Sequence, residues 1–339
     1  MQKTLPKVEL HVHLERALRF QTVQRIIPGF PPDRYVRELL GMPTMRREDY
    51  LARRRAALEL LQSEEALRIA IKDLAQQLVE DGVNYVEIRL APFLHGRQGL
   101  SPENVVRCVV DSLNRAYHET RLDAQLILCT VYSAPEIESE AVAHLVERFQ
   151  GLRVVGFGLM ENPFSAADFS DVDWSLETHQ SAFDFTLEKG LPRLVDADET
   201  VSVERLRDMF AFYRPRRVGH ALACLDDFEL QTQMEEAGTH LEMCPARDMQ
   251  LGLFPTAAEH PLDRLYRRGL SVSISTDGRV TTPVTLSEVY ATLQKHCGWR
   301  QDELFACNAL AIRASFAPHK TKALLGKRLS RAYEKHGGR

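Results

Sequence analysis

Two histidines near the amino terminus are the first residues whose type and spacing point to chemistry. His11 and His13 are one residue apart at the end of an apolar run over residues 8–12. If this run is a β-strand, both side chains lie on one face with their backbones about 6–7 Å apart, so the two imidazoles can bind one ion. An isolated His-x-His pair is more often a pair of core or surface histidines. The pair therefore predicts a metal site only if further ligands join it.

Other ionisable residues lie where later apolar runs end: Asp196 with Glu199 just beyond it, His220, and Asp277. In a closed barrel the eighth strand neighbours the first, which would bring Asp277 to the histidine pair. His220 alone also fits a buried core histidine, and Glu199 fits the first turn of a helix over residues 200–213, where it would complement the helix dipole. Together they favour a carboxylic acid and a histidine beside a metal-activated water, the nucleophile of a hydrolytic deamination.

Eight short apolar or β-branched runs alternate with helical patterns along the chain. The runs cover residues 8–12, 85–90, 125–131, 154–158, 193–196, 217–220, 240–244 and 271–275. Between them, apolar residues recur three and four positions apart, which is typical of amphipathic helices. Alternating strands and helices predict parallel pairing. Eight units, without a Gly-x-Gly-x-x-Gly motif after the first strand, predict an α/β fold of the (β/α)8 TIM-barrel type rather than an open sheet.

The chain organisation follows from this pattern. We expect a single metal-dependent hydrolase barrel domain over residues 1–339. A long, mainly helical insertion at about 20–82 separates the first two strands and is placed to cap the barrel mouth. Further helices follow the eighth strand, at about 284–336.

The composition excludes several kinds of partner. With 43 basic and 47 acidic residues, the chain has no polybasic field to bind nucleic acid or a membrane surface. No stretch approaches the ~18 apolar residues of a membrane span, and no apolar signal segment follows the first residues. The six cysteines form no Cys-x-x-Cys pair, which is typical of reduced thiols. We expect a cytoplasmic protein with a small-molecule partner; nothing in the sequence indicates its oligomeric state.

Several short sequence motifs resemble those of the adenosine deaminase family of the amidohydrolase superfamily, and the similarity continues through most of the chain. They are LPKVELHVHL (5–14), DGVNYVEIR (81–89), VGHA (218–221), CP (244–245) followed by QLG (250–252), HPL (260–262) and STD (275–277). The spacings from Glu199 to His220 and from His220 to Asp277 also resemble those of the family.

The resemblance implies a set of roles. One divalent ion, zinc first, would be bound by His11, His13, Asp196 and Asp277. Glu199 would protonate a purine ring nitrogen, His220 would orient the attacking hydroxide, and ammonia would leave from the exocyclic carbon. The substrate would be adenosine-like or another aminopurine.

The chain departs from the family pattern at the expected site. Asp196 replaces the third metal-binding histidine of a His-Ala-Gly-Glu word, and two His with two Asp also suit Mn²⁺ or Fe²⁺. The family's His-Leu-Asp-Gly becomes His-Leu-Glu15-Arg16, Glu161 stands where a glycine approaches the purine, and the second of two aspartates becomes Gly278. Together with Arg247 and Asp248 in place of the polar Ser-Asn pair after Cys-Pro, these changes point to an altered substrate site.

Two interpretations of the new charges stay open. Arg16, Glu161, Arg247 and Asp248 are either solvated loop charges, or a site in which Arg16 and Arg247 meet a phosphate or carboxylate on the substrate. Three functions are likewise open: an aminopurine deaminase, a hydrolase of a different C–N substrate, and a catalytically impaired relative kept for binding or regulation.

Overall fold

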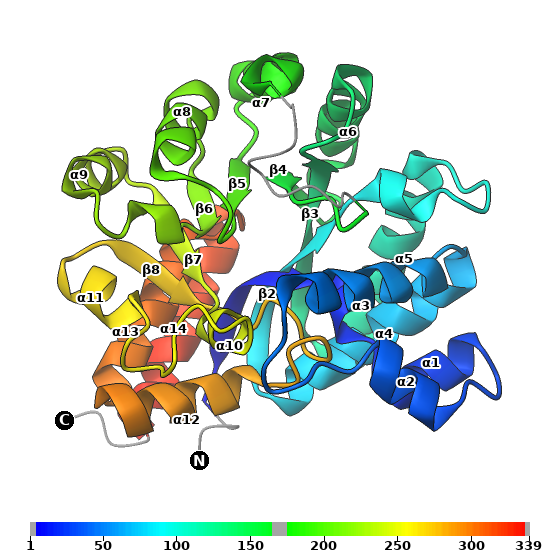
Figure 1. The fold of residues 1–339 in the computed structure, drawn as a ribbon, viewed down its shortest axis with the longest axis horizontal. Coiled ribbons are helices and arrows are strands. Elements are labelled where there is room, and N and C mark those ends of the chain that lie inside the picture. Colours follow the sequence, from blue (N-terminus) through cyan, green and yellow to red (C-terminus); the bar gives the residue numbers. More distant parts are fainter. Residues whose placement is uncertain (1–4, 165–174, 336–339) are drawn as a thin grey trace.

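The structure, a computed structural model, describes residues 5–164 and 175–335. Eight parallel strands pair in chain order from β1 to β8 and form a barrel surrounded by helices (Figure 1). The strands are β1 (Lys7–His13), β2 (Val83–Leu90), β3 (Asp123–Val131), β4 (Val154–Met160), β5 (Arg193–Ala197), β6 (Arg217–His220), β7 (His240–Met243) and β8 (Ser271–Ile274). The predicted TIM barrel is confirmed, and each of the eight predicted runs overlaps one strand.

The barrel closes through the residues just beyond β8. Val12 of β1 and Asp277 form a parallel bridge. The His13 amide donates to the Asp277 carbonyl (3.0 Å), and the Asp277 amide donates to the His11 carbonyl (3.1 Å). The closing hydrogen bonds therefore hold Asp277 beside the histidine pair.

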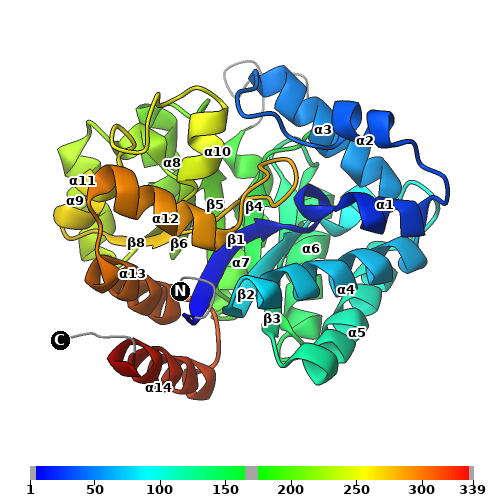
Figure 2. The ribbon, with the colours of Figure 1, turned by 90° about the horizontal axis from the view of Figure 1, so that it is seen from below.

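Four α-helices lie between β1 and β2, and three follow β8 (Figures 1 and 2). The helices are α1 (Phe20–Ile26), α2 (Pro32–Glu38), α3 (Arg47–Leu60), α4 (Glu64–Glu80), α5 (Pro102–Thr120), α6 (Glu136–Phe149), α7 (Gln180–Glu188), α8 (Val203–Tyr213), α9 (Phe228–Glu236), α10 (Pro245–Gln250), α11 (Leu262–Arg267), α12 (Leu286–Cys297), α13 (Gln301–Ala314) and α14 (His319–Lys335). Residue 336, the expected end of the last helices, lies outside the described residues.

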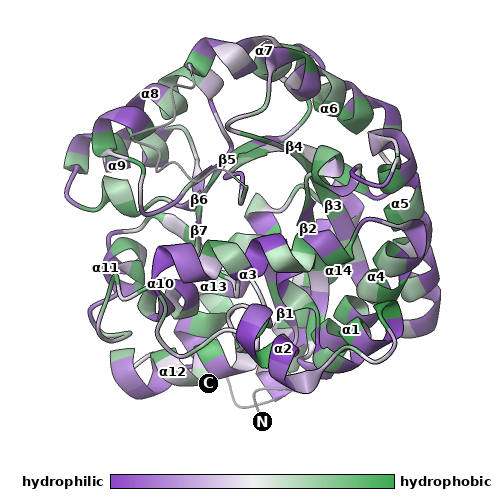
Figure 3. Cartoon of the chain, turned by 45° about the vertical axis from the view of Figure 1, so that its right-hand side comes forward, coloured by the Kyte–Doolittle hydropathy of each residue, from purple (hydrophilic) through white to green (hydrophobic). Residues whose placement is uncertain are grey.

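Local sequence explains where the helices begin. Ser63 caps α4 by accepting a hydrogen bond from the Ala66 amide, and Ser101 caps α5 in the same way, with Pro102 at the first helical position. Along α4 the apolar residues three and four apart are buried. Figure 3 shows hydrophobic and hydrophilic residues alternating around the outer helices, as expected when one stripe packs on the barrel.

The strand β1 alternates between two kinds of buried residue. Its polar residues, at every second position, are Lys7, Glu9, His11 and His13, and the apolar residues between them are Val8, Leu10 and Val12. Side chains alternate across a strand, so one face of β1 packs under the helices and the other points into the barrel. The interior of this barrel is therefore charged.

Ion pairs compensate the interior charges. Arg217 of β6 contacts Glu87 of β2 and Glu242 of β7, and Arg89 of β2 also contacts Glu242; all four are fully buried. Burying such charges is tolerable only when each is paired, because an unpaired buried ion loses several kcal/mol of solvation. Arg89 is the member of this network that also contacts residues of the expected site, at the carboxyl end of the barrel.

The amino-terminal end of the barrel is covered by the last helices. A second apolar cluster joins β1 and β2 to α13 and α14 through Leu10, Tyr85, Ile312 and Leu329, and Figure 2 shows α14 on that side of the molecule. Among residues 5–164 and 175–335, no helix has the length and apolar content needed to cross a bilayer.

Candidate active site

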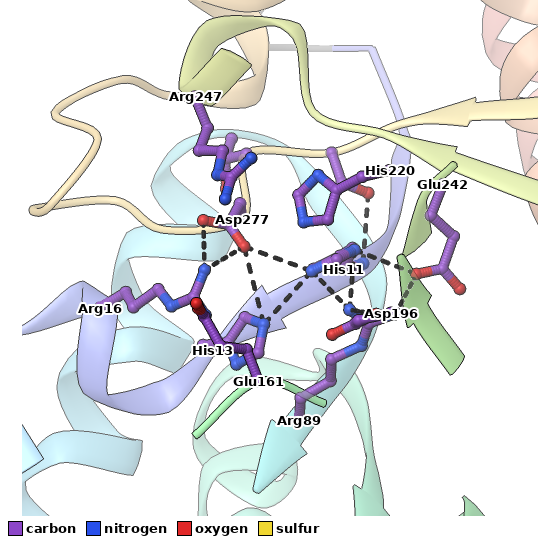
Figure 4. A network of polar contacts seen from close by, with 12 residues as sticks. His11, His13, Arg16, Arg89, Glu161, Asp196, His220, Glu242, Arg247 and Asp277 are labelled. Atoms are coloured by element: carbon purple, nitrogen blue, oxygen red, sulfur yellow. Dashed lines mark hydrogen bonds and ion pairs between the residues drawn. The ribbon is translucent and has the colours of Figure 1, made fainter. Parts of the chain in front are cut away.

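The histidine pair and Asp277 converge at the carboxyl end of the barrel (Figure 4). The Nε2 atoms of His11 and His13 are 3.2 Å apart. Asp277 Oδ1 lies 3.2 Å from His11 Nε2 and 3.6 Å from His13 Nε2. All three side chains are buried. The structure thus brings these three predicted ligands within the reach of one small ion.

Asp196 approaches the histidine pair from β5. One ligand atom each from His11, His13 and Asp196 lie within 4.8 Å of one another. A Cβ atom at Gly219 would lie 2.2 Å from Asp196 Oδ1, so only glycine leaves room for the carboxylate on the neighbouring strand. His11 belongs to a second group of this kind, with His220 and Cys244.

Three residues at the site have backbones in the left-handed region, although none is glycine. They are His220 (φ 60°), Ala221 (φ 54°) and Asp277 (φ 62°). A side chain makes this region costly, and such strain persists mainly where the surrounding structure enforces it, often at functional sites. The strain at His220 and Asp277 is thus an independent indication that their side chains are positioned for a task.

Two arginines neutralise the expected metal-binding carboxylates. Arg16 Nη1 donates to both oxygens of Asp277, and the Tyr50 hydroxyl donates to Asp277 Oδ2. Arg89 Nη1 lies 2.5 Å from Asp196 Oδ1 and 2.8 Å from His11 Nδ1. Burial alone would raise the pKa of Asp277, but Arg16 and the two histidines hold that pKa well below its usual range.

Glu199 lies at the same end of the barrel but outside any helix. The helix α8 begins at Val203 and is capped by Ser202, so the prediction that Glu199 occupies the first turn of a helix over 200–213 is wrong. The turn after β5 takes up these residues instead. Glu199 is paired with Arg247 Nη2 (2.6 Å) and Arg47 Nε (3.1 Å).

His220 is buried next to the histidine pair. Its ring centroid is 4.8 Å from that of His11, and its Nδ1 is 3.7 Å from Asp248 Oδ1, without a hydrogen-bond partner among the described residues. Burial, with the nearby Arg247 cation, lowers the pKa of His220 well below its ordinary value. A neutral imidazole with an unpartnered nitrogen does not fit the alternative of a satisfied core histidine.

The altered residues are not solvated. Arg16, Arg247 and Asp248 are 4%, 3% and 0% exposed, so the interpretation as solvated loop charges is wrong for them, because each enters a buried ion pair. Glu161, which follows β4, is bound by Arg47 and Arg54 of α3. The partners come from segments distant in sequence, so local polarity could not indicate their burial.

The remaining predicted substrate residues lie beside the metal-binding group. Glu15 Oε1 is 3.6 Å from His13 Nδ1 and 3.8 Å from Arg16 Nε. Gly278 packs against Arg16, whose carbonyl lies 3.1 Å from the place of a Cβ at Gly278. Arg16 and Arg247 point at Asp277 and Glu199 in this structure, which are carboxyl groups of the chain itself.

Sequence reasoning missed several residues of the site: Arg89, Glu242, Tyr50, Arg47 and Arg54. A signal existed for the first, because charged residues at alternate positions of an otherwise apolar strand, as in Glu87-Ile88-Arg89, indicate a polar barrel interior. No comparable signal exists for the residues of α3, since their role depends on how the insertion folds over the barrel.

The donor set fits a divalent ion. Two imidazole nitrogens and two carboxylates are the nitrogen and oxygen ligands that zinc, manganese and iron accept, and in this structure they lie close together and buried. Each carboxylate also has an arginine partner, so the negative charge that attracts an ion is already balanced.

Proteins of known family are similar to this chain over nearly its whole length. A family model described as Adenosine deaminase matches residues 6–332. An adenosine deaminase of Enterococcus faecalis is 30% identical over 338 residues, covering 98% of each chain.

Solved structures share the fold at lower identity. An Arabidopsis protein, ADAL, complexed with IMP has a TM-score of 0.86 at 20% identity and covers 99% of each chain. An amidohydrolase of Burkholderia ambifaria with bound zinc has a TM-score of 0.83 at 21% identity, covering 98% of this chain and 93% of that one. The match of the family model over nearly the whole length, together with the 30% identical relative, shows that this chain belongs to the adenosine deaminase family.

Proposed function

We propose that the protein is a hydrolytic deaminase of an aminopurine-type substrate, working at the carboxyl end of the barrel. Family membership supports the reaction class. The observation that carries the proposal is the convergence of His11, His13 and Asp277 beside His220 at that end of the barrel. These are the residue types that a hydrolysis at an electron-poor ring carbon requires.

The expected cofactor is one divalent ion, with zinc as the first candidate and Mn²⁺ or Fe²⁺ as alternatives suited to two carboxylates. His11, His13, Asp196 and Asp277 would hold it. When bound, the ion supplies Lewis acidity for the activation of water. The zinc-bound Burkholderia neighbour supports this choice.

The protein's own groups divide the proton transfers. Glu199 would hold the proton that is given to the ring nitrogen, and Arg247 and Arg47 fix the position of its carboxyl group. His220, neutral and buried beside His11, can accept a proton from the attacking water and orient it. Arg247 contacts both Glu199 and Asp248, so it couples the acid to the carboxylate that faces His220.

The arginines of the site favour a substrate that carries a negative charge. Arg16, Arg47, Arg54 and Arg247 pair with the carboxyl groups of Asp277, Glu161 and Glu199, and arginine is the residue that best recognises phosphate and carboxylate. The Arabidopsis neighbour complexed with IMP supports a purine nucleotide or a similarly anionic aminopurine. Such an anion would have to exchange partners with Glu161 or Glu199.

One experiment tests the reaction. Purified protein, loaded in turn with Zn²⁺, Mn²⁺ and Fe²⁺, is assayed for ammonia release from adenine, adenosine, AMP and a set of pterins, amides and ureides, and for methylamine release from N6-methyl-AMP. Ammonia release from aminopurines that is lost in Glu199→Gln, with metal content unchanged, supports the proposal. Turnover of only the amides or ureides would replace it with hydrolysis of a different C–N substrate.

The impaired-homologue alternative has one observation in its favour, the arginine partners of Asp196 and Asp277. It predicts far less than one ion per chain after purification and after loading. It also predicts no ammonia from any member of the panel, with purine nucleotides binding nevertheless in calorimetry.

A further inference from the structure

We propose that Arg16 is an intramolecular competitor of the divalent ion: its guanidinium holds Asp277, and an ion gains this ligand only when the Arg16 side chain gives it up. The inference rests on the proposed function only in taking the His11 and His13 pair as the metal site. It concerns metal affinity and not the reaction itself.

The competition is for one particular atom. Asp277 Oδ1 is the oxygen that lies 3.2 Å from His11 Nε2 and 3.6 Å from His13 Nε2, so it is the oxygen that an ion between the two imidazoles would meet. Arg16 Nη1 donates to this same oxygen and also to Oδ2. The guanidinium of Arg16 and an ion would share this one oxygen, and the repulsion between two cations in a buried site makes the two contacts compete.

The outer oxygen of Asp277 is engaged as well. The Tyr50 hydroxyl donates to Oδ2, and Arg16 Nη1 donates to the Tyr50 oxygen at 3.1 Å. Arg16, Tyr50 and Asp277 therefore form a closed triangle of hydrogen bonds in a buried environment, where charged hydrogen bonds are strong. Figure 4 shows Arg16 pointing at Asp277 from the side away from His220.

The backbone of Arg16 is fixed in this place. Its carbonyl accepts hydrogen bonds from the amides of Arg279 (3.0 Å), Val280 (2.9 Å) and Thr281 (3.3 Å). The loop after β8 is thus attached to Arg16 on one side and carries Asp277 on the other. Release of Asp277 must occur by rotation of the Arg16 side chain, with its backbone remaining where it is.

Charge balance gives the direction of the effect. Arg16 neutralises Asp277, and Arg89 is shared between Asp196 and Glu242, so a divalent ion would add positive charge to a buried site whose carboxylates already have arginine partners, which is unfavourable. Without the Arg16 charge, Asp277 would be an unpaired buried anion, and a divalent ion would be its natural partner. Removal of Arg16 should therefore tighten metal binding, although the residue lies in the site.

The test measures the dissociation constants of Zn²⁺ and Mn²⁺ by competition with a chromophoric chelator, using the full chain stripped of metal. Arg16→Ala removes the competing charge, and Arg16→Gln removes the charge but keeps a hydrogen-bond donor of similar reach. Arg47→Ala is the matched control, because it also removes one arginine from the mouth but its partners are Glu161 and Glu199. His11→Ala defines binding elsewhere on the protein.

We expect Arg16→Ala and Arg16→Gln to bind both ions at least about tenfold more tightly than the wild type, which corresponds to about 1.4 kcal/mol, whereas Arg47→Ala stays within a factor of about three. Zinc should also raise the melting temperature of the Arg16 variants more than that of the wild type. Circular dichroism establishes that each variant is folded, and Arg16→Gln serves if Arg16→Ala is not.

The outcomes separate the two proposals. Equal or weaker affinity in both Arg16 variants overturns the competition, whatever the protein catalyses. Binding no better than that of His11→Ala in the wild type and in the Arg16 variants overturns it too, together with the metal site. Tighter binding without ammonia release from any aminopurine sustains the competition and removes the proposed reaction.

Discussion

A Cβ atom added to Gly278 would lie 2.8 Å from the Cβ of Arg16, and 2.7 Å from Thr281 Oγ1. Real Cβ atoms do not approach other carbons so closely, so a side chain at 278 and the present position of Arg16 exclude each other. The family pattern has glycine where this chain has Arg16, and aspartate where this chain has Gly278. The two departures are thus complementary, and together they place a cation, in place of a second carboxylate, against Asp277.

The first prediction is an energetic coupling between these positions. Gly278→Asp alone should destabilise the protein, because the new side chain meets Arg16 and Thr281, whereas Arg16→Gly/Gly278→Asp should recover part of the loss. Residues in contact give coupling energies of about 0.5–3 kcal/mol in double-mutant cycles. Urea unfolding of the wild type, both single variants and the double variant measures this quantity. Strictly additive effects would show that the two positions are independent.

The second prediction concerns how α3 is attached to the barrel. Glu161 after β4 pairs with Arg54, which is fully buried, and with Arg47. Removing one partner of a buried ion pair leaves an uncompensated charge and costs about 3–5 kcal/mol. Glu161→Ala should therefore lower the free energy of unfolding by this order and increase amide exchange in α3.

An exposed ion pair that also involves a residue of α3 provides the control. Glu59 contacts Arg97, and both side chains are about half exposed, so Glu59→Ala should cost no more than about 1 kcal/mol. Equal losses in Glu161→Ala and Glu59→Ala would mean that Glu161 does not hold α3 in place.

The sequence was sufficient for the parts of the fold that local patterns determine. The His11-x-His13 spacing places both imidazoles on one strand face, as alternation requires. Asp277 reaches them because a closed barrel makes the eighth strand a neighbour of the first. Each of these inferences depended on periodicity within a segment or on barrel topology.

The ion-pair partners and the burial of the charged residues in the site could not be predicted from such local patterns. Arg16 and Asp277 are 261 positions apart, and Arg89 and Glu242 are 153 apart, so no local pattern relates them. An arginine in a loop is usually solvated, and only the packing of the loop shows that Arg16 is buried. After β5, the Thr200 amide and hydroxyl donate to Asp198 Oδ1 and Ser202 caps α8, so this helix begins later than the sequence pattern indicated.

The third prediction tests whether Asp196 contributes to metal binding. Asp196→Ala should lower metal content after loading, because one oxygen ligand is lost from the group that includes His11 and His13. Asp196→His should retain or raise it, since imidazole is a good zinc ligand. Both variants should fold, because Arg89 keeps Glu242 as a partner. Metal analysis by mass spectrometry decides; unchanged metal content in Asp196→Ala would remove Asp196 from the ligand set.

The fourth prediction is a pH dependence that originates outside the site. His179 is buried in the 3₁₀ turn before α7, and its Nδ1 lies 2.7 Å from Ser139 Oγ, while its Nε2 lies 3.1 Å from the Tyr132 carbonyl. Burial lowers the pKa of His179 from 6.5 to about 4. Between these two values the unfolded chain binds a proton that the folded chain does not. The neutral, buried His179 therefore contributes fully to the free energy of unfolding above pH 6.5, and this contribution is lost as the pH falls toward 4.

Replacing His179 by glutamine should remove this contribution, because the amide can keep both hydrogen bonds without titrating. The loss of stability between pH 7 and pH 4 should shrink by up to about 3 kcal/mol, the free energy that corresponds to the lowered pKa. His144→Gln is the control, since that histidine is 64% exposed and its replacement should leave the pH profile unchanged. Thermal unfolding at half-unit pH steps compares the three proteins. Parallel profiles for wild type and His179→Gln would mean that the acid sensitivity of the fold arises from other buried groups.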